Sequence, residues 1–116
     1  MNATPAAVAD RTARSGSFEI TSTSEGRLEV QGPLVFGTAC QAREEGLRAL
    51  QDTSAREIEI DCQGITASDS AGLTVLLDWL GAAKQQGRSL RFTNLPKELL
   101  AIAHISEVAE LLQKGV

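Results

Sequence analysis

Aromatic residues are scarce in this sequence: its 116 residues include three phenylalanines, one tryptophan and no tyrosine. Aliphatic side chains must therefore fill most of the core. The two cysteines, Cys40 and Cys62, form no Cys-x-x-Cys pair and have no histidine at zinc-ligand spacing. We expect two free thiols and no metal. A chain of this length can bury one core without a disulfide or metal to stabilise it.

Lysine and arginine form no dense cluster, and the formal net charge is −4. A protein that binds nucleic acid or anionic lipid by charge needs a basic surface, so we expect neither partner. No apolar run approaches the roughly 20 residues that span a bilayer, and the first 16 residues lack the long apolar run of a signal peptide. We therefore expect a cytoplasmic protein without direct membrane insertion, which meets a membrane only through a partner.

The chain divides into a short tail and one domain. Residues 1–16 are rich in Ala, Ser, Thr and Arg without an apolar period, which predicts a flexible N-terminal tail. Residues 17–116 form the predicted domain. Alternating apolar and polar residues predict a hairpin that turns at Glu25-Gly26, followed by two more strands; the four strands are 17–22, 27–31, 56–62 and 89–93.

Apolar residues at helical spacing predict helices at 39–50, 70–86, 96–104 and 106–113, the last two being separate or one bent helix. Thr38 is the expected N-cap of the first helix, and Gly87 ends the second. Gly32-Pro33 predicts a break in the chain, and residues 63–69 a loop. The order β-β-α-β-α-β-α predicts an α/β fold, a mixed, mostly parallel four-stranded sheet with helices packed against it.

The segment Asp69-Ser70-Ala71-Gly72 stands at the start of the strongest predicted helix. Asp or Ser at this place accepts hydrogen bonds from free backbone N–H groups, so capping alone explains both residues. A functional interpretation adds an exposed hydroxyl on Ser70 at the rim of the sheet. Phosphorylation there would add about −1.5 to −2 charges, which a helix N-terminus tolerates and an apolar or acidic partner does not.

The same helix has an inward stripe and a flank. The stripe consists of Leu73, Leu76, Leu77, Leu80 and Ala83. We expect the flank to extend a docking surface; it carries Thr74, Val75, Asp78 and Trp79. Tryptophan is enriched in protein interfaces, although a single one on a helix flank also suits partial packing in the core.

No catalytic constellation is visible. His104 is the only histidine and has no partner in the sequence pattern. Asp61 and Asp69 could form a carboxylate pair, but loop termination and capping explain them more simply. Gly64 and Gly72 do not form a phosphate-binding glycine-rich loop. We therefore predict no enzyme activity and no cofactor.

The strand Ile58 to Cys62, then Asp69 to Leu73, then Gly87, resembles the STAS domain family, which includes sulfate-transporter tails and anti-sigma-factor antagonists. The family pattern is a hydrophobic strand, a short loop, Asp-Ser/Thr-x-Gly-Leu/Ile and an amphipathic helix. The resemblance extends from about Phe18 to Leu112, nearly all of the predicted domain. It implies a STAS-type domain that binds a protein partner and performs no chemistry.

Within the family, the chain is most similar to the small stand-alone STAS subunits of bacterial lipid-asymmetry ABC transporters, through Gly32-Pro33-Leu34 and residues 82–87. This implies a cytoplasmic subunit that binds the transporter's ATPase, reaches the inner face of the inner membrane through the complex, and supports phospholipid transport and outer-membrane maintenance.

An alternative stays open because those relatives often carry Thr where this chain has Ser70. Serine matches the residue that a partner serine kinase phosphorylates in anti-sigma-factor antagonists. The sequence does not decide whether the chain self-associates. The predicted partner-binding residues are Asp69, Ser70, Ala71, Gly72, Thr74, Val75, Asp78 and Trp79, and Ser70 is also the candidate phosphorylation site.

Overall fold

Strands and helices alternate along the chain in the predicted order. The computed structural model describes residues 17–105 and 107–114, so the predicted tail at 1–16 lies outside the described residues. The elements are β1 (Glu19–Ser24), β2 (Arg27–Leu34), α2 (Ala39–Asp52), β3 (Glu57–Ser68), α3 (Ser70–Gln85), β4 (Ser89–Thr93), α4 (Lys97–Ile105) and α5 (Ala109–Lys114).

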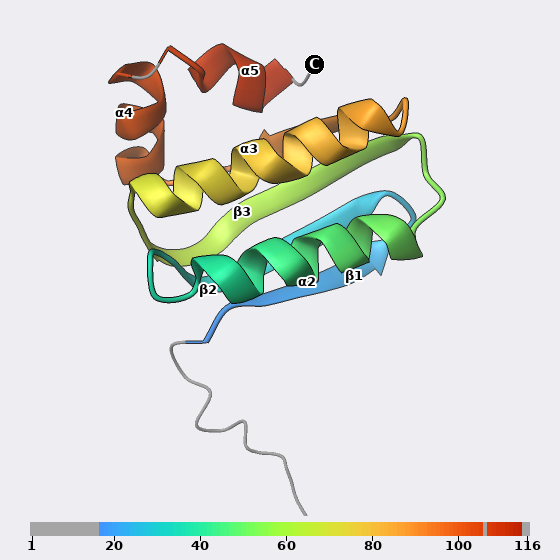
Figure 1. Ribbon diagram of the computed structural model, residues 1–116, viewed down its shortest axis with the longest axis horizontal. Helices are drawn as coiled ribbons and strands as arrows, with labels where there is room; N and C mark the ends of the chain where they lie inside the picture. Colours follow the sequence, from blue (N-terminus) through green and yellow to red (C-terminus); the bar gives the residue numbers. More distant parts are fainter. Residues whose placement is uncertain (1–16, 106, 115–116) are drawn as a thin grey trace, which may run out of the picture.

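The four strands form one sheet in the order β1-β2-β3-β4. β1 pairs antiparallel with β2, whereas β2–β3 and β3–β4 are parallel, which confirms the predicted mixed sheet. Helices α2 and α3 lie side by side in front of the sheet in Figure 1, with α4 and α5 beyond α3. Because both parallel crossovers are helical, α2 and α3 start at the same end of the molecule, where β2 and β3 finish.

Alternation along the strands places one side-chain set against the helices. Leu28 and Val30 of β2 lie there beside Ile58 and Ile60 of β3, all at most 2% exposed. Trp79 of α3 lies in the middle of this core and is fully buried. Its ring centroid is 6.1 Å from that of Phe18 and 6.5 Å from that of Phe92. Three of the four aromatic residues thus gather around one point of an otherwise aliphatic core.

Two of the predicted interruptions of the sheet were wrong. Gly32-Pro33 does not break the chain, because β2 continues to Leu34. Residues 63–68 are not a loop but the second half of β3, which runs to Ser68 and leaves only Asp69 before α3.

The irregular pairing of β3 with β2 explains the second error. Relative to β2, β3 carries one extra residue between Asp61 and Gly64 and another between Ile65 and Ala67. Each bulge shifts the alternation of inward and outward side chains, so the sequence loses its period of two while the backbone stays in the sheet.

Candidate docking surface

The carboxylate of Asp69 joins two chain segments at the end of the sheet. Its Oδ1 accepts hydrogen bonds from the backbone N–H of Ala71 at 2.9 Å and of Gly72 at 3.2 Å, which caps α3. Its Oδ2 accepts a hydrogen bond from the backbone N–H of Phe36 at 3.1 Å, in the connection between β2 and α2. Capping is therefore confirmed as one role of Asp69, and the second bond links the starts of both helices.

Gly72 explains how close these segments come. A Cβ atom on Gly72 would collide with the backbone carbonyl oxygen of Leu34, the last residue of β2. Only glycine lets the first turn of α3 approach the end of β2 at this distance. The residue is itself buried, so Gly72 is a packing residue and does not present the partner-contact surface predicted for it.

The exposed side of the first turns of α3 is polar. Ser70 is exposed at the first helical position, and Thr74, one turn later, is exposed as well. The Thr74 hydroxyl donates a hydrogen bond to the Ser70 carbonyl oxygen at 3.2 Å. The side chain of Ser70 thus faces solvent at the helix start, where a partner or a modifying enzyme has access to it.

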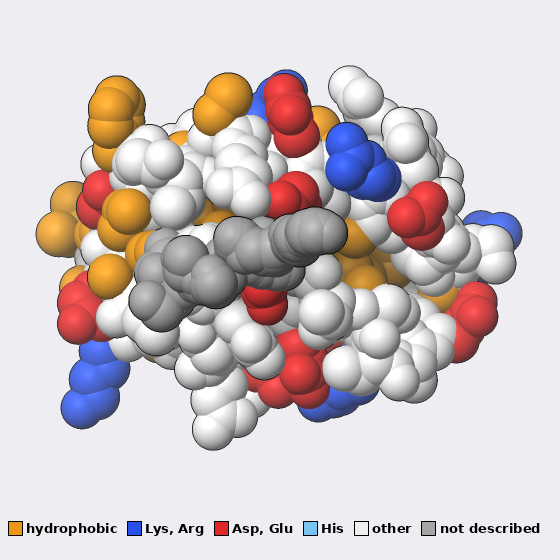
Figure 2. All heavy atoms as spheres, turned by 90° about the horizontal axis from the view of Figure 1, so that it is seen from below, with side chains coloured by type: hydrophobic (Ala, Val, Ile, Leu, Met, Phe, Trp, Pro, Cys, Tyr) orange, Lys and Arg blue, Asp and Glu red, His pale blue; other side chains and the backbone are white. Residues whose placement is uncertain are grey.

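Between α2 and α3 lies a shallow, mainly apolar hollow of about 390 Å³. Its lining residues are Phe36, Ala39, Cys40, Arg43, Ala71, Thr74, Val75 and Asp78. Figure 2 shows hydrophobic side chains gathered at the left end of the molecule, the end at which the β2–α2 connection and the start of α3 lie in Figure 1. We call the hollow together with Asp69 and Ser70 the docking surface.

Phe36 and an ion pair define the character of this surface. Phe36 is 84% exposed, although phenylalanine is among the residues most often buried in proteins. On the other side of the hollow, Arg43 of α2 and Asp78 of α3 form an ion pair with an Nε–Oδ2 distance of 3.0 Å. The pair is about half exposed and gives the apolar hollow a polar rim.

Two residues predicted to lie on the flank of α3 are placed differently. Trp79 is fully buried, and its Nε1–H donates a hydrogen bond to the Arg43 carbonyl oxygen at 3.2 Å. The interface contact predicted for Trp79 is wrong, and the alternative, packing in the core, is confirmed, because α2 packs over that side of α3. Val75 is 3% exposed and forms part of the floor of the hollow. Ala71, Thr74 and Asp78 do line the hollow.

The α2 side of the docking surface was missed by sequence analysis. Phe36, Ala39, Cys40 and Arg43 all come from the β2–α2 connection and the first turns of α2. The available signal was Phe36 itself, a large apolar residue followed by Gly37 just outside the predicted helix. The predicted N-cap Thr38 precedes α2, but its side chain does not cap the helix.

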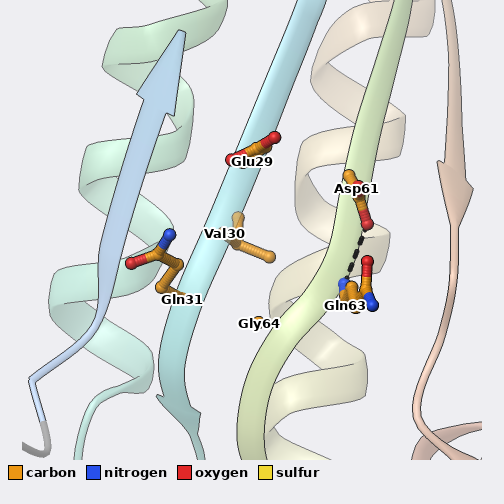
Figure 3. A pocket seen from close by; sticks show the side chains of 6 residues that line it. All are labelled: Glu29, Val30, Gln31, Asp61, Gln63 and Gly64. Atoms are coloured by element: carbon orange, nitrogen blue, oxygen red, sulfur yellow. Dashed lines mark hydrogen bonds between the residues drawn. The ribbon is translucent and has the colours of Figure 1, made fainter. Parts of the chain in front are cut away.

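The face of the sheet opposite α2 and α3 is polar. Figure 3 shows a second hollow there, lined by Glu29, Val30, Gln31, Asp61, Gln63 and Gly64. The Asp61 carboxylate is engaged there: it accepts hydrogen bonds from the Gln63 backbone N–H at 2.9 Å and from the Asn94 amide at 3.0 Å. These bonds, led by the one from Asn94, lower the pKa of Asp61.

Glu59 lies at the centre of the same face. Its carboxylate forms 2.9 Å ion pairs with Arg27 from β2 and Arg91 from β4. The hydrogen bond from Arg91 and the two positive charges lower the pKa of Glu59. We call Arg27, Glu59, Asp61, Arg91 and Asn94 the open-face network.

The remaining chemical candidates lead to no site. Burial raises the pKa of the Cys62 thiol to about 12, so it stays protonated and unreactive. His104 is exposed on α4. Over residues 17–105 and 107–114, no group of three or more His, Cys, Asp or Glu side chains is arranged to hold a metal ion. None of the helices described is long and apolar enough to cross a membrane.

Solved structures share this fold at low sequence identity, and three of them are similar at 10–17% identity. The chain aligns with SpoIIAA, an anti-sigma factor antagonist in its unphosphorylated form, at a TM-score of 0.59 and 13% identity, covering 84% of this chain and 86% of that one. A putative anti-sigma factor antagonist from Thermotoga maritima aligns at 0.67 and 10% identity, covering 83% of each chain. A sulfate transporter family protein from Wolinella succinogenes aligns at 0.59 and 17% identity, covering 81% and 75%.

No curated protein matches the chain. The family comparison is decisive instead: residues 18–113 match the family model described as "Mlab, STAS domain". This match spans the eight elements described within residues 17–114, apart from the last residue of α5, and it includes the Asp69-to-Leu73 motif on which the resemblance was based. The chain belongs to the STAS domain family.

Proposed function

We propose that this chain is the non-enzymatic STAS subunit of a phospholipid-transporting, lipid-asymmetry ABC transporter. In this role it binds the cytoplasmic ATPase subunit and supports assembly or activity of the complex at the inner membrane, and thereby maintenance of the outer membrane. The observation that carries the proposal is the docking surface, with exposed Phe36, exposed Ser70 and an apolar hollow at one end of the molecule. The family description that matches the chain supports the choice of partner.

The physical argument begins with the exposed apolar surface. Moving a phenylalanine side chain such as Phe36 from water into a protein pocket stabilises a complex by about 1.5–3 kcal/mol. The hollow between α2 and α3 offers a complementary recess for an apolar side chain of the partner. An apolar centre with a polar rim, here Ser70 and the Arg43–Asp78 pair, is the usual composition of a protein interface.

The first test is a pull-down of the tagged protein from detergent-solubilised cells, followed by mass spectrometry. Recovery of an ABC ATPase together with its membrane permease is the expected result. Recovery of a soluble serine kinase instead, with phosphate on Ser70, would overturn the transporter proposal.

A charge at Ser70 tests whether this end of the molecule forms the contact. In Ser70→Asp, the carboxylate adds charge where the wild type presents a small hydroxyl, so we expect weaker binding of the purified ATPase by calorimetry. The matched control is Ser54→Asp, which adds the same charge at an exposed serine between α2 and β3, at the opposite end of α2. Equal affinities of the two variants would exclude the docking surface as the contact.

One alternative function has an observation in its favour. The exposed Ser70 hydroxyl at the start of α3 is accessible to a kinase, and a phosphate there would face the N-terminus of the helix, where anions are stabilised. In this reading the chain is an anti-sigma-factor antagonist that phosphorylation of Ser70 releases from its partner. The pull-down separates the two functions through the identity of the protein recovered.

A further inference from the structure

The segment that presents Phe36 is fixed by hydrogen bonds from both sides. On the α2 side, the Thr38 hydroxyl accepts a hydrogen bond from the Val35 backbone N–H at 3.1 Å and donates one to the Pro33 carbonyl oxygen at 2.8 Å. On the α3 side, the Asp69 carboxylate accepts a hydrogen bond from the Phe36 backbone N–H at 3.1 Å, although Asp69 lies 33 positions later in the chain.

Phe36 has almost no burial of its own to hold it, since its side chain is 84% exposed. Its position is set through its backbone instead. A contact residue that is ordered before binding loses less conformational entropy on association, which increases affinity without any added contact.

We propose that Phe36 is the apolar anchor of the docking surface and that Asp69 is its positioning residue. The inference rests on the proposed docking function and deepens it, because it names the partner's chemistry: an apolar pocket that receives a phenylalanine, beside a group that meets the Ser70 hydroxyl. Asp69 acts through its hydrogen bond to the Phe36 backbone and does not itself contact the partner. The capping bonds to Ala71 and Gly72 are a separate structural role of the same carboxylate.

The substitution Asp69→Asn separates the two roles. Asparagine is as good an N-cap as aspartate, and its one carbonyl oxygen can keep the bonds to Ala71 and Gly72. The amide NH₂ group then faces the Phe36 N–H, so two donors meet and the bond to Phe36 is lost. The matched control is Asp61→Asn on the open face, which removes the same charge. The Asp61 carboxylate also accepts a hydrogen bond from a backbone N–H, that of Gln63.

Amide hydrogen exchange of the free protein tests the link without any partner. We expect the Phe36 amide to be protected in the wild type and in Asp61→Asn, and to exchange about tenfold faster in Asp69→Asn, while the Gly72 amide stays protected. A Phe36 amide that exchanges equally fast in the wild type and in Asp69→Asn overturns the positioning role of Asp69, whatever the partner is.

Affinity then tests the anchor. With the partner recovered by pull-down, ATPase or kinase, we expect Phe36→Ala to weaken binding at least about 30-fold and Asp69→Asn about tenfold. Ile105→Ala is the matched control, since Ile105 is equally exposed at 84% but lies at the end of α4; its affinity should stay within about twofold of the wild type.

The double variant decides whether Asp69 acts through Phe36. If it does, adding Asp69→Asn to Phe36→Ala changes affinity by less than about twofold, because the group that Asp69 positions is already gone. If the two substitutions instead lower the affinity by factors that multiply in the double variant, Asp69 has a direct or purely structural role and the proposal is overturned. Unchanged affinity of Phe36→Ala would overturn the anchor, whereas a pull-down without an ATPase refutes only the transporter function.

Discussion

The docking surface and the open-face network belong to the same sheet and differ in the side chains that they leave without a partner. On the open face, Glu59 is shared between Arg27 and Arg91, and Asp61 is bonded to Asn94, so the charges satisfy one another. At the docking surface, Phe36 and the Ser70 side chain face solvent. Paired charges on a strand face are explained by the fold itself, whereas an exposed apolar side chain beside an apolar hollow is typical of a surface that contacts a partner.

The difference follows from position in the sheet. The open-face network lies along the strands, where neighbouring side chains of β2, β3 and β4 stand opposite each other. The docking surface lies where β2 and β3 end and two helices begin, so its side chains have no cross-strand neighbours. Ligand sites of open α/β sheets are found at such ends.

The largest expected effect is that of Trp79→Ala, which tests whether the layer beneath the docking surface is core. Removing a fully buried tryptophan should lower the free energy of unfolding by about 3–5 kcal/mol, measured by urea denaturation. Phe36→Ala is the control at the surface and should change stability by no more than about 0.5 kcal/mol. A tryptophan variant as stable as the control would place Trp79 outside the core.

The next effect is that of Gly72→Ala, which tests the close approach of α3 to β2. Because the added methyl group would collide with the Leu34 carbonyl, we expect a loss of about 1–3 kcal/mol in thermal or urea unfolding. Gly81 lies in the same helix with open space around it, so Gly81→Ala should instead stabilise the protein by about 1 kcal/mol. Similar gains in both variants would show that the approach is not tight.

A smaller effect is the pH dependence of stability that we expect from the open-face network. The pKa values of Glu59 and Asp61 are lowered in the folded state. Their stabilisation is therefore complete above the pKa of the unfolded chain, about 4.3 for Glu and 3.9 for Asp, and is lost as the pH falls through the lower folded-state values.

Unfolding by urea at neutral pH and near pH 3 measures this loss. Glu59→Gln should be less stable than the wild type at neutral pH, and the difference should shrink in acid. Glu44→Gln, at an exposed position on α2, is the control. A difference that does not change with pH would mean that the network contributes no charge-dependent stability.

The smallest effect is expected for the Arg43–Asp78 pair at the rim of the hollow. Exposed ion pairs contribute about 0.2–1 kcal/mol to stability because water screens them and both side chains lose freedom. A double-mutant cycle with Arg43→Ala and Asp78→Ala should give a coupling energy in this range, and raising the salt concentration should reduce it. A coupling above that of Arg27 with Glu59 would reverse the contrast between the two regions.

Much of the fold was predictable because it is encoded locally. Alternating residues identified all four strands, and the stripe from Leu73 to Ala83 identified α3 to within one residue at each end. Gly87, with a φ of 71°, ends α3 as predicted. The second half of β3 was missed because two bulges remove the alternation from which a strand is identified.

Half of the docking surface was equally predictable. The Asp69-to-Gly72 motif gave the cap and the start of α3, since capping depends on residues within one turn. The other half depends on residues far apart in the sequence: nothing near Phe36 shows that its backbone will be bonded to Asp69. The choice between core packing and a surface contact stayed open for Trp79 for the same reason, because only the packing of α2 against α3 buries that side of the helix.

The sequence by itself determined the element order, the mixed sheet and the polar helix start at Ser70, because periodicity and capping act over a few residues. The tertiary structure decided which aromatic side chains are buried and which are exposed to solvent. A Cβ atom on Gly46 of α2 would collide with the Trp79 ring, so its absence lets α2 close over Trp79, while Phe36 is held at the surface by Asp69. Both outcomes depend on contacts between segments more than 30 residues apart, which no local pattern records.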